Sequence, residues 1–337
     1  MTASSPIKLN SDRRFIKVLV VLSAITLIAM IISIADGEYP ITPINIIKTL
    51  LGLPTDNQDY AFIINNLRLP RVLIAWIVGV GLAIAGTITQ GITHNPLAAP
   101  EIIGINAGAS LAAVSLIVLF PNVPLSWLPF AAFGGALTIA LSIYCLAWQG
   151  GSSPMRLILI GVGFELIVTA LTDIMITFGD INNVSQALVW LAGSVYGRTW
   201  TQVWGLIPWI VIFGGLAFLL SRELDILSLG DEIACSLGAQ IEWQRGLLLI
   251  TTVALAGASI ATAGAISFVG LMAPHLARQL VGSSHQELIP IAAIIGGMLV
   301  VVADLLGKVM FAPIELPCGI ITAGVGAPYF VYLLIKK

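Results

Sequence analysis

The sequence has few charged residues and lacks the common motifs of covalent chemistry. Only 9% of its 337 residues are charged, whereas about 25% are charged in a typical soluble domain. No GxxxxGK(S/T) phosphate loop, HExxH or GxSxG motif occurs, which argues against nucleotide binding by that route, zinc proteolysis and serine hydrolysis. We therefore expect a protein that is not an enzyme and binds no cofactor of its own.

Cysteine and histidine are also scarce and scattered. The three cysteines show no CxxC spacing and the three histidines lie far apart, so neither a disulfide framework nor a metal site is predicted. A net charge of −2 gives no basic footprint for nucleic acid. The residues concerned are Cys145, Cys235, Cys318, His94, His275 and His285.

Long apolar segments dominate what is present. Hydrophobic residues make up 58% of the chain and the mean hydropathy is +1.01, more than the core of a soluble protein absorbs. A helix needs about 20 apolar residues to cross roughly 30 Å of hydrocarbon. We predict an all-α polytopic membrane protein, a single transmembrane domain over residues 1–337 with about ten helices, at 18–35, 72–92, 107–120, 128–148, 155–178, 203–220, 246–264, 265–271, 289–306 and 320–335.

Two of the predicted segments are irregular. Residues 265–271 are too short to span alone and are expected to belong to a short or re-entrant helix. Residues 181–200 are predicted to form an external interfacial helix with Ser185 as its cap, because aromatic residues cluster there as they do at membrane surfaces. Residues 1–14 are predicted to be a cytoplasmic tail.

The basic residues orient this topology. The model of alternating spans places ten of the 15 Lys and Arg residues inside: Lys8, Arg13, Arg14, Lys17, Arg156, Arg222, Arg245, Arg278, Lys336 and Lys337. Lys48, Arg68, Arg71, Arg198 and Lys308 fall outside. This bias obeys the positive-inside rule, so both termini are predicted to be cytoplasmic.

Small residues suggest close helix packing and an internal repeat. Gly79, Ala83 and Gly86 form one helical stripe, and residues 257, 261 and 264 form another, each following an arginine at a helix start. Because the two helices run in opposite directions, the pattern fits an inverted repeat. Shared small-residue composition explains it nearly as well.

The stretch 221–245 (SRELDILSLGDEIACSLGAQIEWQR) is the longest polar interruption. Its pattern predicts two short amphipathic helices joined by Gly230, the second ending at Gly238, lying across the membrane surface. Such an element suits contact with a partner. A plain polar loop between two spans explains the pattern equally well.

Three stretches together resemble a known family. They are RLPR followed by GVGLAIAGTITQ and NPLAAPEIIGINAGA, then LSLGDEIACSLG, and then GAISFVGLMAPHLARQLVG continued by Asp304 and ELPCGIITAGVGAPYF. In this order and spacing the chain closely resembles the FecCD-type permeases, the membrane subunits of ABC importers for ferric siderophores, haem and cobalamin. The resemblance extends from about Arg13 to the end of the chain.

The resemblance implies an assembly and a coupling element. Its partners would be a second permease subunit, identical or paralogous, two cytosolic ATPases that bind ATP and Mg, an external substrate-binding protein and the lipid bilayer. Residues 221–243 look like the coupling helices that sit in a groove of the ATPase. The matching positions are Ser228, Gly230, Ala234, Leu237 and Gly238.

The resemblance also implies a docking site for the binding protein. Arg68, Arg71 and Lys308 would form a basic pocket for its glutamates, because arginine holds a carboxylate bidentately. Lys308 stands where arginine is common in the family, which puts a bidentate grip in doubt at that corner. The alternative for all three basic residues is that their side chains anchor the helix ends at the membrane surface.

Membrane-embedded carboxylates are candidates for a pathway. Glu165 and Asp173 lie two to three turns apart in one predicted span, where such groups are functional candidates by default. By similarity, Thr169, Thr172 and Thr322 are also expected near the cargo pathway. For Glu165 and Asp173 an equally good alternative is that the carboxyl group is protonated and forms a hydrogen bond to a neighbouring helix.

The expected function is ATP-driven import of a ferric siderophore across the bacterial inner membrane by alternating access. Cobalamin or haem is the alternative cargo for the same importer type. A proton-coupled secondary transporter using Glu165 and Asp173 is a less favoured hypothesis, and an intramembrane enzyme using the same carboxylates is disfavoured by the missing catalytic motifs.

Overall fold

A computed structural model describes residues 6–335 of the chain except residues 38, 56, 150 and 152. The described residues are all helix and connection, without a strand, and eight of their helices are long and apolar enough to cross a membrane. These are α1 (Pro6–Ala35), α4 (Leu69–Thr93), α6 (Leu128–Ala147), α7 (Pro154–Phe178), α9 (Trp200–Leu219), α12 (Ile241–Ala263), α14 (His285–Val309) and α15 (Cys318–Ile335). Helix α1 begins at Pro6, inside the segment predicted as a tail.

Two shorter helices, α5 (Ile105–Leu119) and α13 (Val269–Val281), bring the membrane helices of the described chain to ten, as predicted. The predicted boundary of 265–271 is wrong, because residues 264–268 are a connection and the helix continues to Val281. The interfacial helix α8 (Ile181–Leu191) ends well before Trp200. Its cap is Asp180, whose side chain accepts from the Asn182 N–H, and Ser185 instead bonds within the helix.

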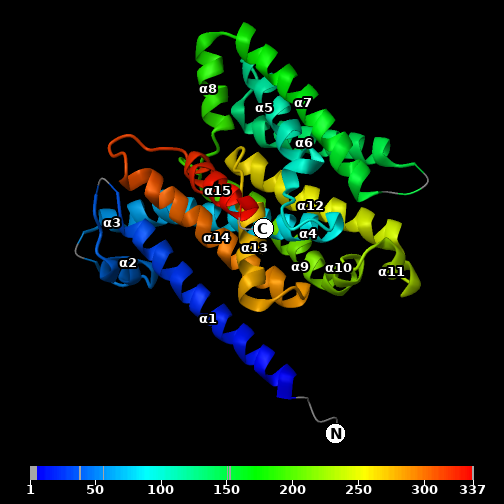
Figure 1. The fold of residues 1–337 in the computed structure, drawn as a ribbon. Coiled ribbons are helices and arrows are strands. Elements are labelled where there is room, and N and C mark those ends of the chain that lie inside the picture. The colour runs from blue at the N-terminus through cyan, green and yellow to red at the C-terminus, as the bar shows by residue number, and fades with distance from the viewer. Residues whose placement is uncertain (1–5, 38, 56, 150, 152, 336–337) are drawn as a thin grey trace.

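The bundle has two ends that separate the basic residues. In Figure 1 the start of α1 lies at the bottom and α10 (Ser221–Leu227), α11 (Asp231–Ser236) and the α6–α7 connection lie at the right, whereas α2 (Pro43–Leu50), α3 (Asp59–Phe62) and the α14–α15 connection lie at the left. Arg14 donates to the Gln279 carbonyl at 3.4 Å at one end of α1, and Lys308 donates to the Ser33 carbonyl at 2.8 Å at the other. Arg14 and the polar stretch therefore share one end, and Lys308 lies at the opposite end.

Helix α4 lies at the centre of the bundle and contacts α14, α12 and α13 along its length. A side chain at Gly79 would overlap the backbone of Gly296 in α14, and one at Gly86 would overlap Gly270 in α13. In the same way Gly257 of α12 faces Phe133 of α6. An inverted repeat that relates α4 to α12 would also relate α14 to α6. The contact between α12 and α6 is therefore the counterpart of the contact between α4 and α14 that such a repeat requires. The repeat itself stays a prediction.

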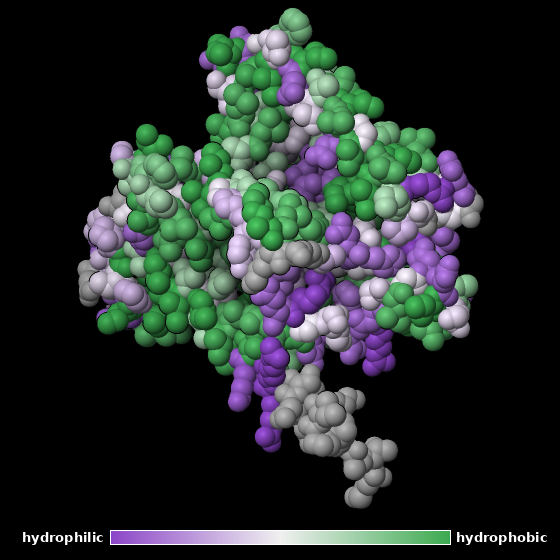
Figure 2. Space-filling view, in the orientation of Figure 1, coloured by the Kyte–Doolittle hydropathy of each residue, from purple (hydrophilic) through white to green (hydrophobic). Residues whose placement is uncertain are grey.

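Helices α5, α6, α7 and α8 form a lobe at the top of Figure 1, and α15 lies beside the centre of the molecule. Figure 2 shows that most of this face is apolar, with hydrophilic residues at its lower and right edges and in the notch below the lobe. An apolar exterior with polar edges is what a bilayer solvates.

Candidate coupling element and docking cluster

The polar stretch forms α10 and α11, which are joined through Ser228, Leu229 and Gly230. Gly230 has φ of +100° and Gly238, just after α11, has φ of +82°, conformations that favour glycine. The prediction of two short helices, joined by one glycine and ended by another, is confirmed.

The two faces of this element differ in burial. Leu224, Leu227 and Ala234 are buried against the bundle. Leu229, Ile233 and Leu237, spaced four residues apart, are 55%, 51% and 61% exposed; we call these three residues the apolar stripe. An apolar stripe at the polar end of the bundle is a surface for a partner.

The predicted contact residues occupy different positions in this element. Ala234 is fully buried, so it supports α11 from beneath and does not lie on the partner-facing surface. Ser228 is exposed and its hydroxyl donates to the Asp225 carbonyl at 2.7 Å. Leu237 and Gly238 are exposed, as contact requires.

Two histidines hold α10 against α4 and α14. His94 follows α4, and its Nε2 donates to the Leu227 carbonyl at 2.6 Å. His285 begins α14, with its Nδ1 2.5 Å and its backbone nitrogen 2.9 Å from Asp225 Oδ1. Burial alone would raise the pKa of Asp225, but the hydrogen bonds and charge of His285 outweigh it and hold that pKa below its usual value. Sequence reasoning missed both contacts; the available signal was that each histidine adjoins a predicted span.

Helix α11 is held by an ion pair. Arg245, near the start of α12, is 1% exposed, and its Nη2 lies 2.5 Å from Asp231 Oδ1 in the first turn of α11. A buried guanidinium needs such a partner, because an isolated charge in the interior is costly. Both short helices are therefore attached to membrane helices by polar contacts.

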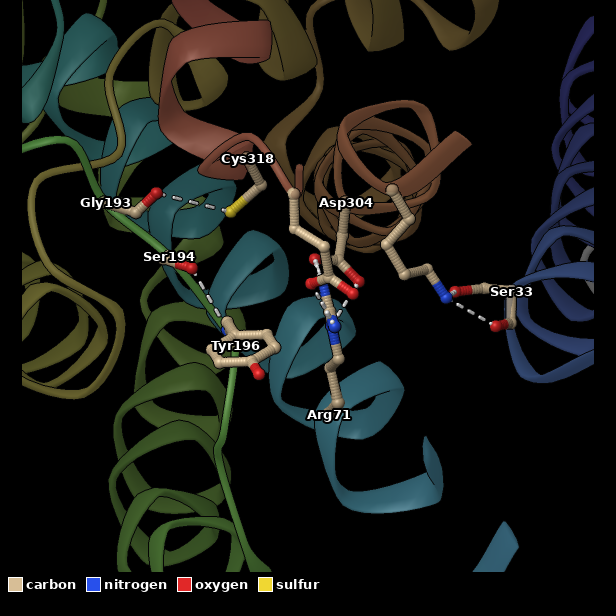
Figure 3. Close-up of polar contacts among 9 residues, drawn as sticks. Ser33, Arg71, Gly193, Ser194, Tyr196, Asp304 and Cys318 are labelled. Atoms are coloured by element: carbon tan, nitrogen blue, oxygen red, sulfur yellow. Dashed lines mark hydrogen bonds and ion pairs between the residues drawn. The ribbon is translucent and has the colours of Figure 1, made fainter. Parts of the chain in front are cut away.

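Arg71 lies at the opposite end of α4, and its guanidinium is already engaged. Its Nε and Nη2 donate to both carboxylate oxygens of Asp304 at 2.8 to 3.2 Å, and its Nη1 donates to Glu315 at 2.8 Å. The ring of Tyr196 lies 5.3 Å from the guanidinium carbon. Figure 3 shows Arg71 directed at Asp304 with Tyr196 beside it.

The other two predicted docking residues also donate within the chain. Arg68 donates to the carbonyls of Ile34 and Tyr39, each at 2.6 Å, and so closes the end of α1. Lys308 donates to Ser33 on the same helix (Figure 3). The structure thus gathers Arg68, Arg71 and Lys308, which we call the docking cluster, at one end of the bundle, but each has an internal partner.

The predicted pathway residues divide into two groups. Glu165, Thr169 and Asp173 follow one exposed stripe of α7, and neither carboxylate forms a hydrogen bond or ion pair with a described residue. Thr172 and Thr322 are buried, and their hydroxyls donate to carbonyls of their own helices, of Val168 and Gly319. The bond from a carboxyl to a neighbouring helix, the alternative for Glu165 and Asp173, is not formed among the described residues.

One further acid lies beside this stripe. Glu101 is in η2 (Pro100–Ile103), the single turn between α4 and α5. Burial raises the pKa of Glu101 to about 7 and the charge of Glu165 adds to it, although backbone hydrogen bonds from Glu101 itself and from Phe268 oppose the shift. Sequence reasoning overlooked it, although it stands within the NPLAAPEIIG motif.

Eight helices able to cross a membrane, with a two-helix element anchored at one end, define a polytopic helical membrane protein among the described residues. Within the described residues, no group of three or more His, Cys, Asp and Glu side chains could hold a metal ion. The chain belongs to the FecCD transport family, whose family model matches residues 25–336. It is therefore a multi-span protein of the bacterial cytoplasmic membrane.

Curated relatives align over nearly the whole chain. The Fe(3+)-citrate import system permease protein YfmE of Bacillus subtilis is 42% identical, covering 96% of this chain and 96% of the relative. The iron(3+)-hydroxamate import system permease protein FhuG of the same organism is 40% identical, covering 95% and 96%. The Fe(3+) dicitrate transport system permease protein FecD of Escherichia coli is 41% identical, covering 85% and 90%.

A solved structure shares the fold. It is an inward-facing conformation of a metal-chelate type ABC transporter, with a TM-score of 0.86 and 29% identity, covering 95% of this chain and 99% of that chain.

Proposed function

We propose that this chain is the permease subunit of an ABC importer that moves a ferric siderophore into the cytoplasm by alternating access. Two separate ATPase subunits would bind and hydrolyse ATP with Mg, and a second permease, identical or paralogous, would complete the pathway. An external binding protein would deliver the cargo. The chain itself would carry out no covalent chemistry.

The observation that carries this proposal is the apolar stripe on an anchored element. Leu229, Ile233 and Leu237 are exposed at the polar end of the bundle. The same element is bonded to α4 through His94 and to α14 through His285. A partner that moves the stripe would therefore move the ends of two membrane helices.

These two helices also carry two of the three docking residues. Arg71 lies in the first turn of α4 and His94 follows its last turn, whereas α14 begins at His285 and carries Asp304 and Lys308 near its end. A 25-residue helix is about 37 Å long, so the pair extends from the coupling element to the opposite end. The close Gly79–Gly296 contact and the Arg71–Asp304 ion pair fasten the two helices to each other.

If Arg71 contacts the binding protein, it would exchange one of its own carboxylate partners for a carboxylate of that protein. Its Nη1 partner Glu315 has a side chain 37% exposed, whereas Asp304 is 2% exposed. A glutamate of the binding protein would replace Glu315 and leave the buried pair intact. Such exchanges favour orientation and association rate over affinity.

The names of the relatives favour an iron chelate as cargo. YfmE and FecD are named for Fe(3+)-citrate and Fe(3+) dicitrate, and FhuG is named for iron(3+)-hydroxamate. We therefore place ferric siderophores before cobalamin and haem. Binding of each candidate to the partner binding protein, measured by fluorescence quenching, would decide the cargo; tight cobalamin or haem binding with no ferric siderophore binding would overturn this choice.

The coupling role is tested by adding charge to the stripe. Ile233→Asp and Leu237→Asp should reduce ATP-dependent iron uptake into cells at least tenfold and leave the amount of chain in the membrane unchanged. Cys235→Asp places the same charge on another exposed position of α11 and should retain uptake. Normal uptake in both stripe variants would refute the proposal.

The proton-coupled alternative is tested in vesicles. Vesicles holding the permease without ATPase subunits should not accumulate ferric siderophore when a proton gradient is imposed, and uptake should appear only with ATPase, binding protein and ATP. Gradient-driven uptake that is lost in Glu165→Gln would favour the secondary transporter.

A further inference from the structure

A cavity of about 760 Å³ lies outside the α7 stripe and the coupling element. It is lined mainly by α6, α8, α9, the end of α12 and residues 194–198. A cavity of this size can hold a substantial part of a small amphiphile. None of the residues assigned to coupling, docking or the pathway lines it.

The polar groups of the cavity gather at one end. Gln186 comes from α8, Arg198 from the connection between α8 and α9, and Thr201 and Gln202 from the start of α9, at the same end of the bundle as Arg71. About one to two turns further along α9, the walls become Leu206 and Trp209, with Phe133 of α6 against Trp209 at 4.7 Å between ring centroids. The cavity is therefore a polar mouth above an apolar shaft.

Arg198 is the cation of this mouth, and it differs from the other arginines at this end. Arg68 and Arg71 both donate to acceptors within the chain. No described residue accepts a hydrogen bond from the Arg198 side chain, and its Nε is buried without a partner. Burial lowers the pKa of Arg198, and only a weak charge interaction with Cys318 opposes it.

An unpartnered, largely buried guanidinium calls for an anion. Removing it from water without a counter-charge is costly, and its planar fork matches the paired oxygens of a phosphate. The apolar shaft calls for hydrocarbon, and exposed positions on α6 and α9 border it, so the cavity opens onto the apolar exterior of the bundle. A hydrophilic metal chelate would find polar partners at the mouth of the cavity but none in its apolar shaft.

We propose that this cavity is a binding site for one anionic phospholipid. Its phosphate binds Arg198 beside the amides of Gln186 and Gln202, and an acyl chain lies in the shaft between α6 and α9. Tyr196, which also lines the cavity, is the ring that lies against the Arg71 guanidinium, so the occupant borders the docking cluster.

Two glycines allow the cavity to be filled without touching the arginine. Gly134 of α6 and Gly205 of α9 both line the cavity, and a Cβ atom at either would meet no atom within 4 Å. Gly215 also has open space around it and lies on α9, but it does not line the cavity. Gly215→Leu is therefore a matched control for Gly205→Leu.

The test is native mass spectrometry of the full chain, purified from bacterial membranes and titrated with phosphatidylglycerol or phosphatidylethanolamine. The wild-type chain should retain one phosphatidylglycerol in preference to phosphatidylethanolamine. Arg198→Gln should weaken that binding about tenfold, Arg198→Lys should retain part of it, and Gly205→Leu and Gly134→Leu should weaken it while Gly215→Leu does not.

Several results would overturn the proposal. Equal retention of phosphatidylglycerol by wild type, Arg198→Gln and Gly205→Leu would show that lipid binds elsewhere. Binding of inorganic phosphate that competes with phosphatidylglycerol at equal concentration would identify an anion site without a lipid shaft. Displacement of the lipid by a ferric siderophore would assign the cavity to cargo. Gly205→Leu keeps the test decisive if Arg198→Gln fails to fold.

Discussion

Helices α4 and α7 are alike in sequence character but opposite in their surroundings. Each has 25 residues, and the spans that contain them have hydropathies of 2.2 and 2.1. Yet 89% of the apolar stretch of the α4 span is buried inside the chain, against 22% for α7. Hydropathy identifies both as membrane helices and does not distinguish the central one from the peripheral one.

Small residues and carboxylates make the distinction. Gly79 and Gly86 let α4 approach α14 and α13 at backbone distance, which is how membrane helices pack without a hydrophobic driving force between them. Helix α7 instead exposes Glu165 and Asp173. A carboxylate facing hydrocarbon costs about 2.5–3.5 kcal/mol or more, so this face suits water or a second permease better than lipid. We infer that α4 belongs to a rigid frame and α7 to the pathway.

The largest difference between the two helices is expected for a glycine replacement. Gly79→Leu should prevent accumulation of folded chain, because its side chain would overlap the α14 backbone. A Cβ atom at Gly163 on α7 would meet no atom within 4 Å, so Gly163→Leu should accumulate like wild type. Fluorescence-detected size-exclusion chromatography measures both. Equal accumulation would remove the distinction between frame and pathway.

The next largest effect is expected at the outer ion pair of the frame. Arg71→Ala leaves Asp304 buried and uncompensated, which should cost about 3–5 kcal/mol of unfolding free energy. Arg71→Leu combined with Asp304→Leu should recover most of this loss, because it removes both charges. Denaturant unfolding in detergent measures these values, with the exposed Arg222→Ala as control, expected within about 0.5 kcal/mol of wild type. A loss below about 1 kcal/mol in Arg71→Ala would contradict the account.

A smaller, pH-dependent effect is expected at Glu101. Its pKa is raised from 4.5 to about 7 in the folded chain, so the folded state binds the proton more tightly than the unfolded state does. Stability should therefore be fully retained below about pH 4.5 and fall as the pH rises through 7, by on the order of 3 kcal/mol. Glu101→Gln should flatten this profile in unfolding measurements between pH 5 and 8. An unchanged slope in the variant would assign the pH dependence to other groups.

The smallest effect on stability is expected on the α7 stripe. Glu165→Gln and Asp173→Asn should each change the unfolding free energy by less than about 0.5 kcal/mol, because neither carboxylate has a partner among the described residues. Iron uptake should nevertheless fall several-fold in the double variant. Reduced stability without reduced uptake would reverse the roles assigned to the two helices.

Local patterns were sufficient to predict the spans and the two short helices, and contacts between distant residues were not. Apolar length predicts α4, α7 and α12, and glycines at 230 and 238 predict where α10 and α11 end. No local pattern indicates that Arg71 pairs with Asp304, 233 residues away, or that Asp225 bonds to His285. The burial of Ala234 likewise depends on what α11 packs against.

The most direct test of the account is the water accessibility of the α7 stripe. The exposed Cys145 and Cys235 would first be replaced by serine, and single cysteines then introduced as Glu165→Cys, Thr169→Cys and Asp173→Cys, with Val211→Cys and Ile212→Cys at exposed apolar positions of α9 as controls. Reaction with a charged methanethiosulfonate in assembled transporter requires water, because the thiolate is the reacting form. We predict that the three α7 cysteines react at least about tenfold faster than the α9 controls. Equally slow reaction at all five positions would place the α7 stripe in lipid and contradict its assignment to the pathway.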